Sequence, residues 1–266
     1  MRPSFVQLPK PFIACVVTEP DPDSAIATIR NSEYDGAHAF DLHLRSLEQQ
    51  YHNKNDLERI IKCTSKPMLM INYRTNSTWA GQATDEERVE SHLIAVEAGA
   101  SACDLMGDLY DPSPLEITHK PEAIDRQRRL IDKLHAKGVE VLMSSHTWVP
   151  MTCEQVVEQL KALEARGADM VKVAAAVNND EELVEAFKTT LALKRELKVP
   201  FVHICMGQHG KIHRFVGPML GSSLIFTVQN YTPKGHKEQP LVRAAKAVFD
   251  NLDWRVARSA LEEGEE

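Results

Sequence analysis

A lysine stands in the middle of an apolar, strand-like segment. Lys172 lies between Val171 and Val173 in DMVKVAAAV, residues 169–177. Side chains alternate along a strand, so the valines are expected on one face and the lysine on the opposite, inward face. Burying an ammonium group is costly unless its charge is paired or lost. Without a nearby carboxylate the amine would be partly neutral, and a neutral amine is the nucleophile that Schiff-base chemistry on a ketone or aldehyde requires.

A structural role is the alternative for this lysine. Its amine could reach the end of the strand, or it could pair with a carboxylate such as Asp41 or Asp104. His146 bears on the choice, because it ends a strand-like segment after the small residues Ser144 and Ser145, which leave space around its ring. A lone histidine is more often structural, but on a neighbouring strand it could carry the protons that a carbinolamine step needs.

Other polar side chains also stand where strand-like segments end. These are Asp41, His43, Arg74, His203 and Cys205, then His209, His213 and Arg214 after the seventh segment, and Thr232, His236 and Gln239 after the eighth. Imidazoles and carboxylates suit zinc or iron, so a metal site is one alternative. Its ligands would be Asp41, His43, His146 and His203. The absence of a close H-x-H pair on one strand disfavours it.

Strand-like and amphipathic helical segments alternate along the chain. Strands are expected at residues 11–18, 37–44, 67–74, 101–107, 139–148, 169–177, 200–207 and 222–230. They are nearly continuous apolar runs, as parallel strands covered on both faces are. Helices are expected at 21–34, 84–100, 121–138, 152–167, 179–198, 212–221 and 241–252. This alternation predicts an α/β fold, the (β/α)₈ TIM barrel, whose chemistry gathers at the carboxyl ends of the strands.

The barrel is predicted to be a single domain over residues 1–266. Its core would span about residues 11–252, and residues 253–266 would form a polar tail. An open doubly wound sheet is the alternative fold, but it would place a glycine-rich phosphate turn after the first strand. The segment there is TEPDPDS, residues 18–24, so no dinucleotide site is expected.

Composition excludes several classes of protein. The net charge of −7 and the pI of about 5.9 argue against nucleic acid or an anionic membrane as a partner. No apolar run approaches the roughly 20 residues that span a bilayer, and the N-terminus lacks a signal-peptide core, so a cytoplasmic location is expected. The five cysteines form no CxxC pair, which predicts buried thiols and neither disulfides nor a zinc knuckle.

Several of these segments together resemble the type I 3-dehydroquinate dehydratases. LMSSHTW (142–148) and MVKVAAAV (170–177) are similar to that family's fifth and sixth strands, and MINYR (70–74) is similar to the end of its third. CMGQHGKIHRFVG (205–217) and QNYTPKGHKEQP (229–240) resemble the loops after its seventh and eighth strands. The resemblance covers about residues 11–252. It implies a barrel enzyme of the shikimate pathway that dehydrates 3-dehydroquinate to 3-dehydroshikimate through a lysine imine.

The resemblance also implies roles for individual residues. The imine lysine would be Lys172, and the general acid/base would be His146. The substrate-binding residues would include Arg214, which pairs with the substrate carboxylate, Arg74, Thr232 and Gln239. This chemistry needs no metal or organic cofactor. The implied partner is a small carboxylate-bearing ketone, and related barrels often pair as homodimers.

The chain departs from the family pattern around these residues. Asp41 and His43 stand in FDLHL (40–44), where the family usually has Glu-x-Arg, and they are the substrate-binding candidates on the second strand. Thr78 replaces a glutamate that pairs with the catalytic histidine, and Met106 replaces the glutamate of a DLE pattern. The loss of an arginine weakens anion binding, since a histidine is charged only when protonated. His146 lacks its acid partner unless Asp41 or another acid takes over.

Two other functions fit the same residues. A Schiff-base lyase of this family could act on a different β-hydroxy ketone, by dehydration or retro-aldol cleavage, because the changed residues alter the substrate pocket. A barrel kept only as a binding module would be expected to lose Lys172 or His146 first, and both remain. The sequence therefore favours a hydro-lyase of the 3-dehydroquinate dehydratase type, with the second substrate class as the alternative.

Overall fold

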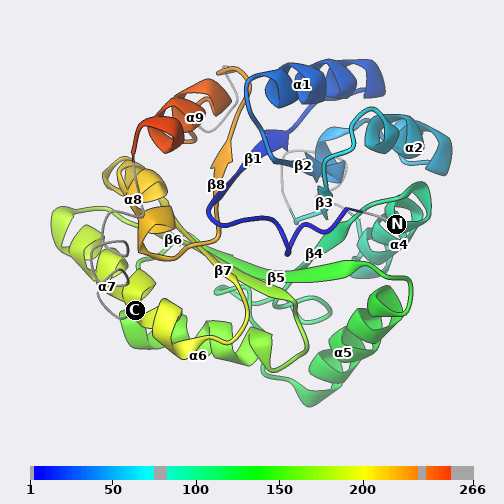
Figure 1. The fold of residues 1–266 in the computed structure, drawn as a ribbon. Helices are drawn as coiled ribbons and strands as arrows, with labels where there is room; N and C mark the ends of the chain where they lie inside the picture. Colours follow the sequence, from blue (N-terminus) through cyan, green and yellow to red (C-terminus); the bar gives the residue numbers. More distant parts are fainter. Residues whose placement is uncertain (1–2, 75–82, 233–237, 253–266) are drawn as a thin grey trace, which may run out of the picture.

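The computed structural model describes residues 3–74, 83–232 and 238–252. Its strands are β1 Phe12–Val17, β2 Ala39–His43, β3 Met68–Ile71, β4 Ala102–Met106, β5 Glu140–Thr147, β6 Met170–Ala176, β7 Phe201–Met206 and β8 Leu224–Thr227. They pair in parallel in the order β7-β6-β5-β4-β3-β2-β1-β8, so that β1 joins β8 (Figure 1). The backbone N–H of Ser223 donates to the carbonyl of Phe201 at 2.8 Å, which links the two ends of this order. The predicted (β/α)₈ barrel is confirmed.

The helices surround the strands (Figure 1). They are α1 Pro22–Tyr34, α2 Lys54–Lys62, α4 Asp85–Ala98, α5 Pro121–His135, α6 Cys153–Glu164, α7 Asp180–Glu196, α8 His213–Leu220 and α9 Val242–Asn251. Short 3₁₀ segments lie at Leu44–Ser46, Gln49–Tyr51 and His209–Lys211. Sequence patterning predicted each of these helices except α2. This nine-residue helix is mostly charged, and its two buried residues, Leu57 and Ile60, stand three apart on one face, so its apolar pattern is regular but short.

Local signals set the ends of α4 as the sequence indicates. Thr84 and Glu87 form a reciprocal capping box: the Thr84 hydroxyl accepts from the backbone of Glu87, and the Glu87 carboxylate accepts from the backbone of Thr84. Gly99 ends the helix with a φ of 114°, a left-handed conformation that favours glycine. The helix start lies beside the end of β3, because Asp85 contacts Arg74 and Arg88 donates to the carbonyl of Tyr73.

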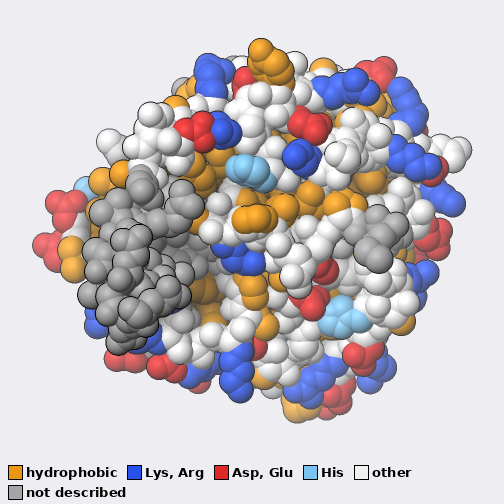
Figure 2. Space-filling model, viewed as in Figure 1, with side chains coloured by type: hydrophobic (Ala, Val, Ile, Leu, Met, Phe, Trp, Pro, Cys, Tyr) orange, Lys and Arg blue, Asp and Glu red, His pale blue; other side chains and the backbone are white. Residues whose placement is uncertain are grey.

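The amino end of the barrel is closed by the N-terminal segment, which crosses it in Figure 1. Phe5 is fully buried, and its ring meets that of Phe12 edge-on at a centroid distance of 5.2 Å. The backbone N–H groups of Phe5 and Val6 donate to Oε2 of Glu140 at 2.8 and 2.9 Å. Hydrophobic side chains lie over the centre of this face, and acidic and basic side chains are interspersed around its rim (Figure 2). The pocket described below therefore lies at the opposite, carboxyl end of the barrel.

Three sequence predictions concern the whole chain. All five cysteines are free thiols and four of them are buried, which agrees with the predicted absence of a disulfide framework. Within the described ranges, no helix combines the length and the apolar character needed to cross a membrane. The polar tail at 253–266 lies outside the described residues, and the single-domain boundary stays a prediction.

Candidate active site

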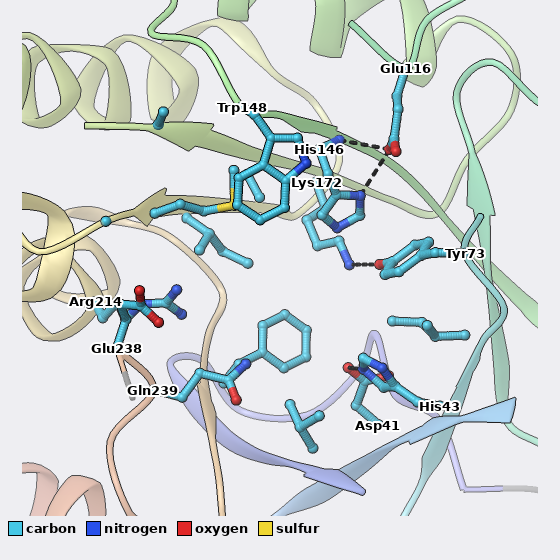
Figure 3. Close-up of a pocket in the computed structure, with 18 of the residues that line it drawn as sticks. Asp41, His43, Tyr73, Glu116, His146, Trp148, Lys172, Arg214, Glu238 and Gln239 are labelled. Atoms are coloured by element: carbon cyan, nitrogen blue, oxygen red, sulfur yellow. Dashed lines mark hydrogen bonds and ion pairs between the residues drawn. The ribbon is translucent and has the colours of Figure 1, made fainter. Parts of the chain in front are cut away.

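A cavity of about 360 Å³ lies at the carboxyl ends of the strands (Figure 3). Lys172 from β6 and His146 from β5 both line it. The two strands are neighbours, and Ser144 lies opposite Lys172 in their register. Val171 and Val173 are fully buried, while the lysine side chain turns into the cavity, in agreement with strand parity. The topology thus brings the predicted lysine and histidine into one site.

The amine of Lys172 is paired with a carboxylate. Its side chain is only 2% exposed, and Nζ lies 2.7 Å from Oδ2 of Asp104 in β4. Nζ also donates a short hydrogen bond to the hydroxyl of Tyr73, and the Ser144 hydroxyl donates to the other oxygen of Asp104 at 2.5 Å. This environment satisfies a charged ammonium. The expectation of a partly neutral amine assumed that no carboxylate was near; Asp104 is such a carboxylate, and it is the partner that the alternative named.

Tyr73 is a pocket residue that sequence reasoning missed. It follows β3, and its hydroxyl donates to Oδ2 of Asp104 at 2.8 Å. Burial, and next the charge of Asp104, raise the pKa of Tyr73 well above its ordinary value, so the phenol stays protonated. Its ring meets the imidazole of His146 at a centroid distance of 4.2 Å, so that one side chain touches both predicted catalytic groups (Figure 3).

His146 has a carboxylate partner in Glu116. Oε2 of Glu116 lies 2.9 Å from Nδ1 of His146 and accepts from its backbone N–H at 2.8 Å. A carboxylate at Nδ1 favours the tautomer with its proton there, which leaves Nε2 as the free base. Glu116 therefore takes the place of the acid whose loss at Thr78 was noted in the sequence; Thr78 itself lies outside the described residues.

The loop between β4 and α5 holds Glu116 in place. The residue has a φ of 48°, in the left-handed region that non-glycine residues rarely adopt. A β-carbon on Gly107 would lie 2.7 Å from the Glu116 carbonyl oxygen, so only glycine lets the loop pack this closely on the end of β4. The buried guanidinium of Arg166 donates to the carbonyls of Gly107 and Thr118 at 2.5 and 2.6 Å. This loop, residues 107–120, therefore supplies the acid that contacts His146.

The second strand contributes Asp41 and His43, as predicted, and also Arg45. Nε2 of His43 lies 3.3 Å from Oδ2 of Asp41. Burial lowers the pKa of His43, and the charge of Asp41 only partly opposes this, so the ring is a poor substitute for an arginine. Arg45, two residues further on, lines the same cavity, and no ion pair is recorded for it with any described residue. Sequence reasoning stopped at the Asp-x-His match and missed it.

Arg74 lines the cavity but is held by acids outside it. Its guanidinium contacts Oδ2 of Asp85 and Oδ1 of Asp108, each at 2.6 Å. These two short ion pairs make Arg74 less available to a substrate anion than its position in MINYR predicts. It ties the start of α4 to the loop that follows β4.

The loops after β7 and β8 meet beside Arg214. Its Nε is buried without a hydrogen-bond partner among the described residues, and Glu238 lies next to it (Figure 3). Burial lowers the pKa of Arg214, and the charge of Glu238 partly opposes this. Gln239 also lines the cavity. Thr232 is exposed and is not among the lining residues, so its predicted place in the pocket is not seen; His236 lies outside the described residues.

His203 does not join the pocket. Its Nδ1 lies 2.9 Å from the hydroxyl of Thr190, which also lies 2.8 Å from Nε2 of His213. The ligand set proposed for the metal alternative is therefore split between two sides of the sheet. In the part of the chain that the structure describes, no group of three or more His, Cys, Asp or Glu side chains has a metal-binding arrangement.

The fold and the site together define a class of protein: a (β/α)₈ barrel that carries a lysine and a histidine, the groups for imine chemistry, at the carboxyl ends of adjacent strands. A model of the type I 3-dehydroquinase family matches residues 13–252. The chain belongs to the type I 3-dehydroquinase family.

Individual relatives agree with this assignment. The 3-dehydroquinate dehydratase of Alkaliphilus oremlandii is 30% identical over 120 residues, 44% of this chain and 46% of its own. That of Neisseria gonorrhoeae is 32% identical over 130 residues, 47% of this chain and 49% of its own. The chain spans about half the length of the curated relatives it matches.

Solved structures share the fold. The 3-dehydroquinate dehydratase from Geobacillus kaustophilus has a TM-score of 0.76 at 18% identity, over 91% of this chain and 90% of its own. The type I enzyme from Clostridium difficile, solved with covalent modified comenic acid, has a TM-score of 0.75 at 16% identity, over 92% and 93% of the two chains. At these identities the likeness concerns the barrel alone.

Proposed function

We propose that the protein is a 3-dehydroquinate dehydratase, which removes water from 3-dehydroquinate through an imine on Lys172. The observation that carries the proposal is one cavity lined by a lysine and a histidine, each with its own carboxylate: Asp104 for Lys172 and Glu116 for His146. Membership of the family, and relatives named for this reaction, support the choice of substrate. The cytoplasmic location and the homodimer stay predictions.

The first half of the reaction would build the imine. The uncharged amine of Lys172 attacks the ketone carbon to give a carbinolamine, and loss of water gives a protonated imine. The positive nitrogen withdraws electrons from the neighbouring carbon and makes its C–H bond acidic. Asp104, 2.7 Å from Nζ in the resting site, would stay beside the cation as its counter-charge.

The second half would use His146 as the base. With its Nδ1 proton held by Glu116, Nε2 is free to take the proton from the carbon next to the imine. The β-hydroxyl then leaves as water, and hydrolysis of the imine frees 3-dehydroshikimate and the lysine. Arg214 would hold the substrate carboxylate and orient the ring towards His146, with Gln239 beside it.

Reductive trapping tests the proposal directly. The purified protein is treated with sodium borohydride and 3-dehydroquinate, digested and analysed by mass spectrometry. We expect an adduct on Lys172 in the wild-type protein and none in Lys172→Met, together with an absorbance rise from the enone product in untreated wild type. No adduct and no enone would reject 3-dehydroquinate as the substrate.

A second substrate class is favoured by one observation. Two of the groups expected to bind the substrate are altered: Arg74 is held by Asp85 and Asp108, and burial lowers the pKa of His43. A pocket changed in this way could suit a different β-hydroxy ketone, by dehydration or retro-aldol cleavage. Trapping with a panel of β-hydroxy ketones separates the two, because an adduct on Lys172 with another ketone and none with 3-dehydroquinate would favour this alternative.

A further inference from the structure

The hydroxyl of Tyr73 lies on a path from the amine of Lys172 to the carboxylate of Asp104. Nζ of Lys172 donates to this hydroxyl, and the hydroxyl in turn donates to Oδ2 of Asp104 at 2.8 Å. The same Oδ2 lies 2.7 Å from Nζ. The three groups therefore form a closed ring of hydrogen bonds: Nζ donates to the Tyr73 hydroxyl and to Asp104, and the Tyr73 hydroxyl donates to Asp104.

The set is buried and held from outside. The side chains of Lys172 and Asp104 are 2% and 0% exposed, so bulk water does not compete for their protons. The Ser144 hydroxyl donates to Oδ1 of Asp104 and leaves Oδ2 for the other two groups. Because burial and the charge of Asp104 keep the phenol of Tyr73 protonated, Tyr73 can pass a proton on but does not keep one.

This arrangement offers a proton acceptor in direct contact with Nζ for a step that the imine chemistry requires. An ammonium has no lone pair, so Lys172 must lose a proton before it can attack a ketone. Glu116 holds the proton on Nδ1 of the His146 imidazole, and the proposed function uses Nε2 of the same ring as the base at carbon. A second acceptor beside Nζ separates the chemistry at nitrogen from the chemistry at carbon.

We propose that Tyr73 and Asp104 are catalytic residues that take the proton of Lys172 and later return it. The inference rests on the proposed imine chemistry. The N–H bond of Lys172 breaks as the Tyr73 oxygen takes the proton, and the Tyr73 O–H bond breaks as its proton passes to Oδ2 of Asp104. The products are a neutral amine, an intact phenol and a carboxylic acid, so charge and protons balance.

The return step uses the same path. After the attack, one proton moves from nitrogen to oxygen and gives the neutral carbinolamine. Asp104 then gives its proton through Tyr73 to the carbinolamine hydroxyl, which leaves as water, and the nitrogen lone pair forms the C=N bond. This leaves a protonated imine beside the Asp104 carboxylate, the same charge pair as in the resting site.

The test removes only the hydroxyl of Tyr73. Tyr73→Phe keeps the ring that contacts His146, and Tyr34→Phe, at a residue 92% exposed, is the matched control. Single-turnover reactions with 3-dehydroquinate are quenched with borohydride to time imine formation, and absorbance times the enone. We expect imine formation in Tyr73→Phe to slow by about a hundredfold, the lower end for proton transfer catalysts because the direct contact between Lys172 and Asp104 remains.

The rates of the two steps distinguish a relay from a structural role. In Tyr73→Phe the enone should form as fast as the imine is trapped, and deuterium at the carbon next to the ketone should no longer slow the enone. Trapping at the wild-type rate, or an enone step slower than trapping with a full deuterium effect, would overturn the inference. The proposed function would stand in both cases and would fail only if wild type itself gave no adduct.

A measurement on wild type covers the case of a variant that does not fold. The rate of imine trapping is followed in mixtures of H₂O and D₂O. A relay through Tyr73 moves two protons together, so the rate should fall along a curve as the deuterium fraction rises. A straight line would mean that a single proton moves, through the direct contact of Lys172 with Asp104, and would remove Tyr73 from the path.

Discussion

Two groups of ionisable side chains lie on opposite sides of the barrel wall, and they differ in whether acids contact them. In the pocket, Lys172 and His146 each contact a carboxylate. Behind β7, His203 and His213 share only the hydroxyl of Thr190 and contact each other at a ring distance of 4.8 Å. We refer to the first as the pocket ion pairs and to the second as the buried histidine pair.

The difference shows what sets the charge of a buried group in this fold. β4 and the loop after it carry Asp104 and Glu116 into the pocket, whereas no acid is recorded beside the buried histidine pair among the described residues. Burial lowers the pKa of His203 well below its ordinary value and that of His213 to about 4, with the nearby Arg214 adding to the effect on His213. The pocket therefore brings carboxylates to its lysine and histidine, whereas the buried histidine pair stays neutral as part of the core.

The largest expected effect comes from removing the pocket lysine. Lys172→Met should lower kcat for 3-dehydroquinate on the order of 10⁴-fold or more, because among the described residues no other lysine lines the cavity. The folded state should persist, since Asp104 keeps the hydroxyl donors Tyr73 and Ser144. Circular dichroism and turnover are measured beside Lys188→Met, an exposed lysine on α7. Turnover within tenfold of wild type would show that the lysine is structural.

The second effect tests the other pocket ion pair. Glu116→Gln should lower kcat by about a thousandfold, because the amide no longer stabilises the proton on Nδ1 of His146 or the cation formed when Nε2 accepts one. Imine trapping on Lys172 should change much less, since the lesion lies at the C–H step. The control is Glu122→Gln in the first turn of α5, which is exposed. If both variants turned over alike, the contact between Glu116 and His146 would have no catalytic role.

The third effect concerns the buried histidine pair and appears in stability. His213 has an ordinary pKa of 6.5 and a folded value of about 4. Between these pH values the unfolded chain binds a proton that the folded protein does not, so the free energy of unfolding falls as pH drops from 6.5 towards 4, by about 3 kcal/mol at most.

The variant His213→Gln isolates this contribution. Glutamine can still form a hydrogen bond with Thr190 but does not titrate. The decrease in the free energy of unfolding on acidification should therefore be smaller by up to about 3 kcal/mol. At neutral pH the free energy of unfolding of the variant should be lower than that of wild type. Urea unfolding across the pH range measures it, with the exposed His209→Gln as control. An unchanged pH slope in His213→Gln would mean that the ring is not the group held neutral.

The same contrast explains how far the sequence could be read. The eight strands and the inward direction of Lys172 follow from periodicity and parity, which act over a few residues. The sequence could name Asp104 only as one possible partner of Lys172. Their contact depends on the order of β4, β5 and β6 in the barrel, which the sequence pattern does not show. Glu116 reaches His146 through an irregular loop whose path depends on Gly107 and Arg166, and no pattern in residues 107–120 signals that path.

Histidines were the hardest residues to assign. His146 and His203 both stand on strands with small or apolar neighbours, so sequence left open which of them faces the pocket. Register settles it: Val173 lies opposite His203, and Ala174 lies opposite His146. Val173 turns away from the barrel axis, and His203 shares its direction. Thr232 was assigned to the pocket only because the loop after β8 resembles the family's closing loop. That resemblance does not fix the direction of its side chain, and Thr232 is exposed outside the pocket.

The smallest expected effect extends the comparison to the arginines. Arg74 is held by Asp85 and Asp108, whereas Arg45 lines the cavity with no ion pair recorded to a described residue. The guanidinium of Arg45 lies over the ring of Tyr73 at 5.9 Å from its centroid. Binding a substrate anion or hydroxyl there breaks no ion pair with a described residue, whereas at Arg74 it would compete with two carboxylates. Arg45 should therefore contribute more to substrate binding than the sequence match suggested, and Arg74 less.

Arg45→Gln should raise KM by about tenfold, equivalent to about 1.4 kcal/mol, with kcat nearly unchanged, because the contact would be alike in the substrate complex and the transition state. Arg59→Gln, at an exposed arginine of α2 that pairs with Asp23, is the matched control and should change neither constant. Arg74→Gln completes the set. It should lower the thermal midpoint more than it raises KM, since it removes the cation that contacts both Asp85 and Asp108 and leaves Asp108 without its ion pair, while Asp85 keeps Arg88. A KM effect of Arg74→Gln larger than that of Arg45→Gln would reverse the ranking and would mean that substrate displaces one of the two acids from Arg74 on binding.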